Sequence, residues 1–198
     1  KLNSADNDQF SFDAIIKVGG QFYHKSGNTN GPMKDFSGFP NSSDFYNDYD
    51  VVVLDTRVTA YLSTVESQSL VNFVTKRGGG LICMGPVDHL NKTFLALQPV
   101  RSVDRFTSYT KTYLDIDSFT IFPESSTALL HDEYTLNLIP GSEAYKTTDL
   151  KPAARVAVSF KGSDNSMLAV HRYGSGRVAY LGSEMTWLWH MATRVDMR

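Results

Sequence analysis

The residues whose types could do covalent chemistry are a cysteine, a histidine and a glutamate that lie beside apolar runs. Cys83 is part of the run L-I-C-M-G at residues 81–85, and His89 follows shortly after it. A cysteine thiolate attacks an acyl carbonyl when a histidine takes its proton and a carboxylate orients that histidine. Glu184, in the segment G-S-E at residues 182–184, could supply the carboxylate. Cys83, His89 and Glu184 are therefore the catalytic set that an enzyme would use.

Cys83 also has a structural interpretation. Ile82 and Met84 flank it, and no basic residue adjoins it that would lower the pKa of the thiol. Free cysteine is among the most buried residue types in proteins. We therefore expect Cys83 to be an unreactive core residue, with the nucleophile as the alternative.

The histidines do not form a metal-binding pattern. His24, His131, His171 and His190 are not spaced as H-x-x-x-H, and no carboxylate cluster accompanies them. His89 could equally be a polar surface residue at the start of a short helix. A single cysteine allows neither an intramolecular disulfide nor a thiolate-rich metal site. We expect no metal and no cofactor.

Composition points to an ordinary globular protein. The chain has 198 residues, of which 41% are hydrophobic and 20% charged, and its net charge is −2. This charge provides no basic field for nucleic acid or anionic membranes. No apolar run approaches the roughly 18 residues of a membrane span. We predict one soluble domain over residues 1–198, without nucleic-acid binding or direct membrane insertion.

The clearest structural signal is a strand, a helix and a second strand. Residues 51–54 (V-V-V-L) and 81–84 (L-I-C-M) are short apolar runs typical of buried strands. Between them, Ser63 and Glu66 form the capping box S-x-x-E, and the glycines at 78–80 end the predicted helix. Such a unit makes a right-handed parallel crossover, so the fold class is α/β.

The remaining segments up to residue 150 give structural signals of different strength. Residues 14–18 predict a strand, whereas residues 21–47 are rich in Gly, Pro, Asn and Ser and have the composition of a long loop, either a functional flap or a missed element. Residues 88–97 predict a short helix with Leu90, Phe94 and Leu97 on one face. Residues 100–150 are interpreted as an irregular insertion of short strands and turns.

The end of the chain predicts an antiparallel meander. Three β runs at residues 155–160, 167–173 and 177–181 are separated by turns rich in Gly, Ser, Asp and Asn. We place them at the far edge of a mainly parallel sheet. Only residues 63–77 give a strong helical pattern, so we expect one face of the sheet to be left bare.

Three of these stretches together carry a family resemblance. The strand Y-D-V-V-V-L, the G-G-G after the helix and the segment Y-G-S-G-R-V-A-Y-L-G-S-E-M-T-W-L-W resemble the class I glutamine amidotransferase-like domain. The resemblance covers roughly residues 45–100 and 150–190. Within this group, the chain most specifically resembles the uncharacterised amidotransferase-like modules of larger bacterial proteins, which often carry membrane spans and von Willebrand A-type domains. It implies a three-layer, flavodoxin-like fold. It also implies that the domain is part of a longer protein, which could be membrane-anchored.

The resemblance also implies that the catalytic site is degenerate. Active members place the cysteine in a turn of form G-x-C-x-G and add a downstream His-x-Glu pair. Here Leu81 stands in place of the first glycine, and Gly182 stands in place of the histidine. The expected function is a non-catalytic binding or assembly module of a larger protein. The alternatives are a hydrolase or amidotransferase that uses Cys83, and a carbohydrate-binding domain of the trehalose-utilisation type.

Any ligand site is expected where the parallel strands end, because open α/β sheets bind ligands at the carboxyl ends of their strands. The residues expected to converge there and bind a ligand are Asp55, Gly85, Pro86, Asp88, His89, Glu184 and Trp187. Trp187 and Trp189 could instead pack in the core. The expected partners are other domains of the same polypeptide or another protein, with a homo-oligomer as a further option.

Overall fold

The computed structural model describes residues 12–26, 34–36, 38–101, 103–106, 114–115, 144–147, 149–160 and 166–183. Five residues whose roles were interpreted from the sequence lie outside these ranges: His131, Glu184, Trp187, Trp189 and His190.

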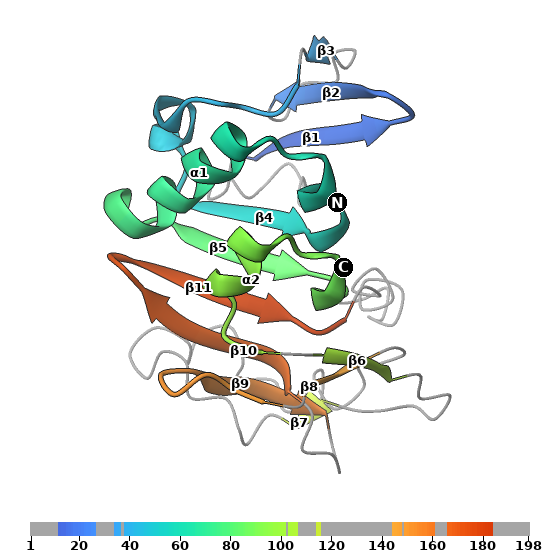
Figure 1. Cartoon of the computed structure of the whole chain (residues 1–198), viewed down its shortest axis with the longest axis vertical. Helices are drawn as coiled ribbons and strands as arrows, with labels where there is room; N and C mark the ends of the chain where they lie inside the picture. Colours follow the sequence, from blue (N-terminus) through green and yellow to red (C-terminus); the bar gives the residue numbers. More distant parts are fainter. Residues whose placement is uncertain are drawn as a thin grey trace, which may run out of the picture.

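A six-stranded mixed sheet forms the centre of the described structure (Figure 1). The first three strands in spatial order run parallel and the last three alternate in direction. The strands, in that order, are β4 (Val51–Asp55), β5 (Gly80–Met84), β11 (Gly176–Leu181), β10 (Ser166–Tyr173), β9 (Arg155–Phe160) and β7 (Leu114–Asp115). The prediction that residues 51–54 and 81–84 are parallel strands of one sheet is confirmed, and the two are direct neighbours.

The helix between β4 and β5 begins at the predicted capping box. The Ser63 hydroxyl accepts a hydrogen bond from the Glu66 backbone N–H at 3.3 Å, and the Glu66 carboxylate accepts one from the Ser63 N–H at 2.6 Å. Helix α1 (Thr64–Asn72) continues into a π-helical turn, η3 (Phe73–Arg77), which ends at Gly78. The helical prediction for residues 63–77 is confirmed.

The second helix is shorter than predicted. A 3₁₀ turn, η4 (Val87–His89), precedes helix α2 (Lys92–Leu97), whose first turn is capped by the Asn91 side chain. The Asn91 Oδ1 atom accepts from the Phe94 N–H at 3.1 Å. Because this cap fixes the start of the helix, residues 88–90 lie outside it. Leu90, Phe94 and Leu97 are buried, as the helical pattern indicated.

The core lies between the sheet and these helices. Alternate side chains of β5 and β11 point toward the helices and are almost fully buried. They meet the apolar side chains of α1, η3 and α2. The main residues of this layer are Leu54, Leu70, Phe73, Val74, Leu81, Cys83, Phe94, Leu97, Val178 and Tyr180.

The predicted C-terminal meander is confirmed as β9, β10 and β11. Strand β11 nevertheless lies inside the sheet, where it pairs with β5. The turn before it rests on the end of η3, where the Ser175 N–H donates to the Thr75 carbonyl at 3.0 Å. A Cβ atom at Gly176 would lie 2.3 Å from the Gly79 carbonyl oxygen. The glycines of Y-G-S-G therefore allow a close approach between two backbones.

Of the two alternatives for residues 21–47, a functional flap or a missed element, the second holds over most of the described part. Strands β1 (Asp13–Val18), β2 (Gln21–Ser26) and β3 (Lys34–Phe36) form a separate antiparallel sheet, and η1 (Ser43–Asp48) is a 3₁₀ helix. Gly19 has a φ of 60°, so Gly19-Gly20 is a hairpin turn that pairs Val18 with Gln21. The two glycines therefore return the chain instead of leading it into a loop.

Short strands are also found within residues 100–150. Strand β6 (Val103–Phe106) pairs with β8 (Ala144–Thr147), and Val100 forms a bridge with Leu150. Most of this stretch lies outside the described residues, so its interpretation as an irregular insertion stays a prediction.

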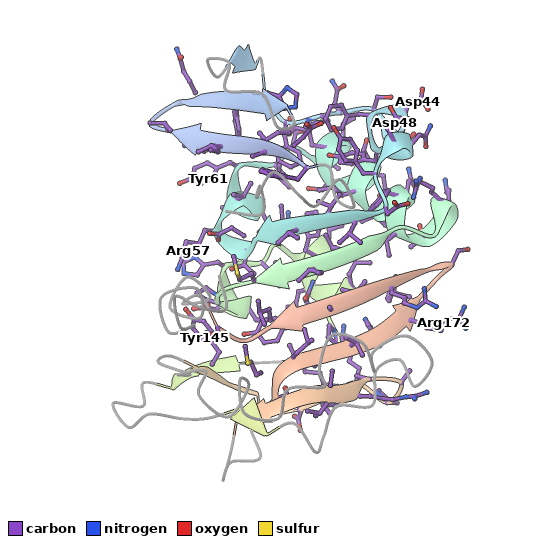
Figure 2. All side chains as sticks on the ribbon, turned by 180° about the vertical axis from the view of Figure 1, so that it is seen from behind. Asp44, Asp48, Arg57, Tyr61, Tyr145 and Arg172 are labelled. Carbon is purple, nitrogen blue, oxygen red and sulfur yellow. The ribbon has the colours of Figure 1, made fainter. Side chains whose placement is uncertain are left out.

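The two α-helices in the described residues cover the same face of the sheet (Figure 1). In Figure 2 the opposite face is toward the viewer, and no described α-helix crosses it. On this face the edge-strand residues Val51 and Val53 are 50% and 60% exposed. The expectation of a bare sheet face therefore holds for the described residues. None of the helices that the structure describes is long and apolar enough to cross a membrane.

Candidate functional site: the carboxyl edge and a groove on the uncovered face

The carboxyl ends of β4, β5 and β11 lie side by side. Asp55 is the register partner of Met84, and Met84 is the register partner of Leu181. Asp55 and Gly85 therefore reach the same edge of the sheet, followed in the chain by Pro86, Asp88 and His89. The structure thus brings together the predicted site residues that it describes.

Asp55 has a structural task at this edge. Its Oδ1 atom accepts from the Arg57 N–H at 2.9 Å, which caps the 3₁₀ helix η2 (Thr56–Tyr61). Its Oδ2 atom pairs with the Arg57 guanidinium at 3.2 Å. The carboxylate is therefore occupied by the turn that directly follows its strand.

The residues after β5 turn the chain away from the sheet. Gly85 has a φ of 112°, which side chains disfavour, and Pro86 precedes η4. Asp88 and His89 lie in η4 with exposed side chains. The backbone carbonyl of His89 accepts a hydrogen bond from Thr59 Oγ1 at 3.0 Å. The position of His89 is thus fixed through its backbone, while its imidazole faces solvent.

Two residues that the sequence analysis did not select hold this edge together. Asn91 donates from its backbone N–H to Thr59 Oγ1 at 3.2 Å and from its side chain to the Thr59 carbonyl at 3.2 Å. It also donates to Ser67 Oγ at 3.4 Å. This network joins η2, η4, α1 and the start of α2, and Thr59 is buried. Of these two residues, only Asn91 had a signal in the sequence, because an asparagine before K-T-F is typical of a helix N-cap.

Cys83 lies in the core and away from the exposed edge. Its side chain is fully buried, and Gln98 Nε2 donates a hydrogen bond to its sulfur at 3.1 Å. Burial raises the pKa of the Cys83 thiol to about 12, and the Gln98 hydrogen bond opposes this only in part. Among the residues that the structure describes, no histidine is hydrogen-bonded to this sulfur. The thiol is therefore protonated at neutral pH.

The side chain of the C-cap residue Gln98 and two side chains from distant segments bind the carbonyls at the end of α2. Gln98 Nε2 donates to the Phe94 carbonyl at 3.2 Å, Lys151 Nζ donates to the Leu95 and Ala96 carbonyls, and His171 Nε2 lies 2.6 Å from the Leu97 carbonyl. The last carbonyls of a helix lack the usual partner one turn ahead, and of these the Leu95 carbonyl also accepts from the Gln98 backbone N–H at 3.3 Å. Burial lowers the pKa of His171 and of Lys151. A neutral His171 that donates from Nε2 fits this geometry.

No group of three or more His, Cys, Asp and Glu within the described part of the chain is arranged to hold a metal ion. The titratable residues that are described near the carboxyl edge act as caps or point to solvent. This edge is therefore a packed junction between turns.

A broad groove of about 1220 Å³ lies on the uncovered face of the sheet. Its floor is aliphatic and comes from four neighbouring strands. The floor residues include Val51 of β4, Ile82 of β5, Ala179 of β11, and Leu168 and Val170 of β10. The groove extends to the amino ends of β4 and β5, at the side of the sheet opposite to the predicted ligand edge.

Arginines gather at one end of this groove. Arg172 of β10 and Arg177 of β11 are direct cross-strand partners, and Arg155 of β9 is the register partner of Val170. All three line the groove and are exposed, and Figure 2 shows Arg172 at this end. Like charges directly opposite each other on neighbouring strands destabilise a sheet. No ion pair links these three arginines to a described carboxylate, and Arg77 lies 3.9 Å from Asp50.

Comparison with known proteins shows a shared fold. No family model and no curated protein matches the chain. The cytoplasmic protein STM3548 from Salmonella typhimurium matches with a TM-score of 0.55 and 17% identity, over 88% of this chain and 84% of that chain. The cytoplasmic protein STM1381 from Salmonella typhimurium LT2 matches with a TM-score of 0.55 and 14% identity, over 93% of this chain and 96% of that chain.

A weaker match concerns the beta-galactosidase from Rahnella sp. R3. Its TM-score is 0.45 at 16% identity, over 75% of this chain and 23% of that chain. This value is too low to support an argument. The chain therefore shares an α/β fold with the two Salmonella proteins, and the comparisons assign it no activity.

Proposed function

We propose that this chain is a non-catalytic module of the class I glutamine amidotransferase-like, flavodoxin-like kind, and that it acts as a binding or assembly domain of a larger protein. The observation that carries the proposal is the position of Cys83. This thiol is fully buried, bonded to Gln98 and held protonated by its surroundings.

The local backbone explains why Cys83 is not presented as a nucleophile. In active members of the family the cysteine sits at a sharp turn after its strand. Here Cys83 is still inside β5, where it is paired in register with Leu54 and Tyr180. The residue with positive φ is Gly85, two positions later. Leu81 in place of the first glycine favours continuing the strand through the cysteine.

The groove supports the binding half of the proposal. Its volume exceeds the roughly 300–1,000 Å³ of ordinary small-molecule pockets. Contiguous apolar surface on a soluble domain commonly marks a protein contact. The groove lies away from Cys83, which is on the helix-covered face of β5. Binding in the groove would therefore not depend on the thiol.

Thiol reactivity and glutaminase activity test the non-catalytic half. We expect native protein to resist iodoacetamide at neutral pH, whereas unfolded protein should be labelled at Cys83. We also expect no ammonia release from glutamine. Rapid labelling of the native thiol, together with ammonia release that disappears in Cys83→Ser, would support the enzyme alternative instead.

A further inference from the structure

We propose that the groove on the uncovered face binds an acidic amphipathic helix of another protein or protein domain, with aliphatic side chains on the sheet and carboxylates on Arg155, Arg172 and Arg177. The inference rests on the proposed function and names the chemistry of the partner. It follows from the aliphatic floor, from the placement of the arginines and from the fact that no described α-helix crosses this face.

The floor matches the apolar face of a helix. In α/β folds both faces of the sheet are normally covered by helices, because both faces carry aliphatic side chains. The described helices cover one face, and the other presents Val51, Ile82, Ala179 and Val170. A helix with apolar residues at every third or fourth position buries such a surface.

The arginines give the groove a direction. Arg155, Arg172 and Arg177 lie on β9, β10 and β11, whereas Asp50 lines the groove beside β4. The exposed Asp44 and Asp48 of η1 lie beyond β4 and away from Arg172 in Figure 2. Arg77 also lines the groove beside β4 and lies 3.9 Å from Asp50, so the excess of positive charge lies on the side of β9 to β11. A partner helix should place its carboxylates over β9 to β11.

The same surface fits other anionic partners less well. Proteins that bind single-stranded nucleic acid combine a cationic track with aromatic side chains for base stacking. The described residues that line this groove include no Phe, Tyr or Trp, and Arg155, Arg172 and Arg177 lie at one end of it. Membrane-binding surfaces insert protruding apolar side chains into the bilayer, whereas these lie on the floor of a groove. An amphipathic protein segment is therefore favoured.

Fluorescence anisotropy with two synthetic helical peptides tests the inference on the full 198-residue chain. The peptides share one leucine face, and one carries Glu where the other carries Lys. We expect the Glu peptide to bind and the Lys peptide to bind more weakly. The double variant Arg172→Glu/Arg177→Glu should weaken binding of the Glu peptide by about tenfold and favour the Lys peptide.

Matched variants separate the groove from general charge and hydrophobicity. Arg57→Glu changes an arginine at the opposite end of the sheet and should leave peptide binding unchanged (Figure 2). Val51→Asp, on the groove floor, should abolish binding, whereas Val65→Asp on the solvent side of α1 should not. All of the substituted positions are exposed, and circular dichroism checks that each variant folds.

Several results would overturn the inference. They are the absence of Glu-peptide binding up to about 1 mM, equal binding of both peptides, and an equal loss in Arg57→Glu. Tighter binding of single-stranded DNA or of phosphatidylserine vesicles would assign the arginines to those partners. A dimer in sedimentation that the double reversal dissociates would assign the groove to a second copy.

The outcome remains separable from the proposed function. Failed peptide binding with an unreactive Cys83 removes this partner and leaves a non-catalytic module. Ammonia release that depends on Cys83 removes the proposed function whatever the peptides do.

Discussion

The two faces of the central sheet differ more in what lies on them than in the character of their strands. On the helix-covered face, Leu81, Val178 and Tyr180 are almost fully buried. On the other face, their chain neighbours Ile82 and Ala179 are only partly buried. The residues of the two faces alternate along β5 and β11. The comparison shows that apolar alternation makes a strand, while the position of the helices decides which half becomes core.

The largest expected effect comes from removing bulk on the covered face. Phe94→Ala should lower the free energy of unfolding by about 3–5 kcal/mol, because the ring is fully buried between α2 and the sheet. Val53→Ala on the uncovered face should change it by no more than about 0.5 kcal/mol. Urea denaturation of both variants measures the difference. Equal losses would mean that the uncovered face is also core.

A second prediction concerns the turn that seats β11 beneath η3. Gly176→Ala should cost about 1–3 kcal/mol, because the new methyl group would meet the carbonyls of Gly79 and Val74 at 2.3 and 2.4 Å. Gly20→Ala is the control, since no heavy atom lies within 4 Å of the position that its new methyl group would take. Thermal unfolding compares them. A neutral Gly176→Ala would show that the turn can move away from η3 at little cost.

The third prediction treats Cys83 as a small core residue. Cys83→Ala should lower stability by about 1–2 kcal/mol, because a buried sulfur and its hydrogen bond with Gln98 are lost. Chemical denaturation gives the value. A gain in stability would indicate that the Gln98–Cys83 contact is strained.

The smallest expected effect is a dependence of the free energy of unfolding on pH, caused by His171 on the helix-covered face of the sheet. Burial lowers the pKa of His171 below its ordinary value, so the folded state favours the neutral ring. The unfolded chain binds a proton near pH 6.5, and stability should therefore fall as the pH decreases below about 6.5.

Variants isolate this contribution from that of the carboxylates. His171→Gln should flatten the loss of stability between about pH 6.5 and 5, since its amide does not titrate there. His89→Gln, at an exposed position, should keep the wild-type slope. Urea midpoints across this pH range measure both. A wild-type slope in His171→Gln would exclude His171 as the source.

Local sequence signals were sufficient to predict much of the sheet and the edge at which the candidate site residues lie. Ser63 and Glu66 predict the start of α1 because both partners of the capping box lie within one turn. Asp55, Gly85 and His89 could be placed at one edge because parallel strands end together. Their roles as caps and turn residues were not predicted, because these depend on Thr59 and Asn91 from other segments.

The sequence by itself determined the elements whose hydrogen bonds and apolar periodicity are local: α1, the strands that flank it, and the β9–β10–β11 meander. Only the tertiary structure decided that β11 lies beside β5, that Lys151 and His171 cap α2, and that Arg155, Arg172 and Arg177 share one end of a groove. The physical reason is that these contacts depend on strand register and long-range packing, which bring together residues that no local pattern connects.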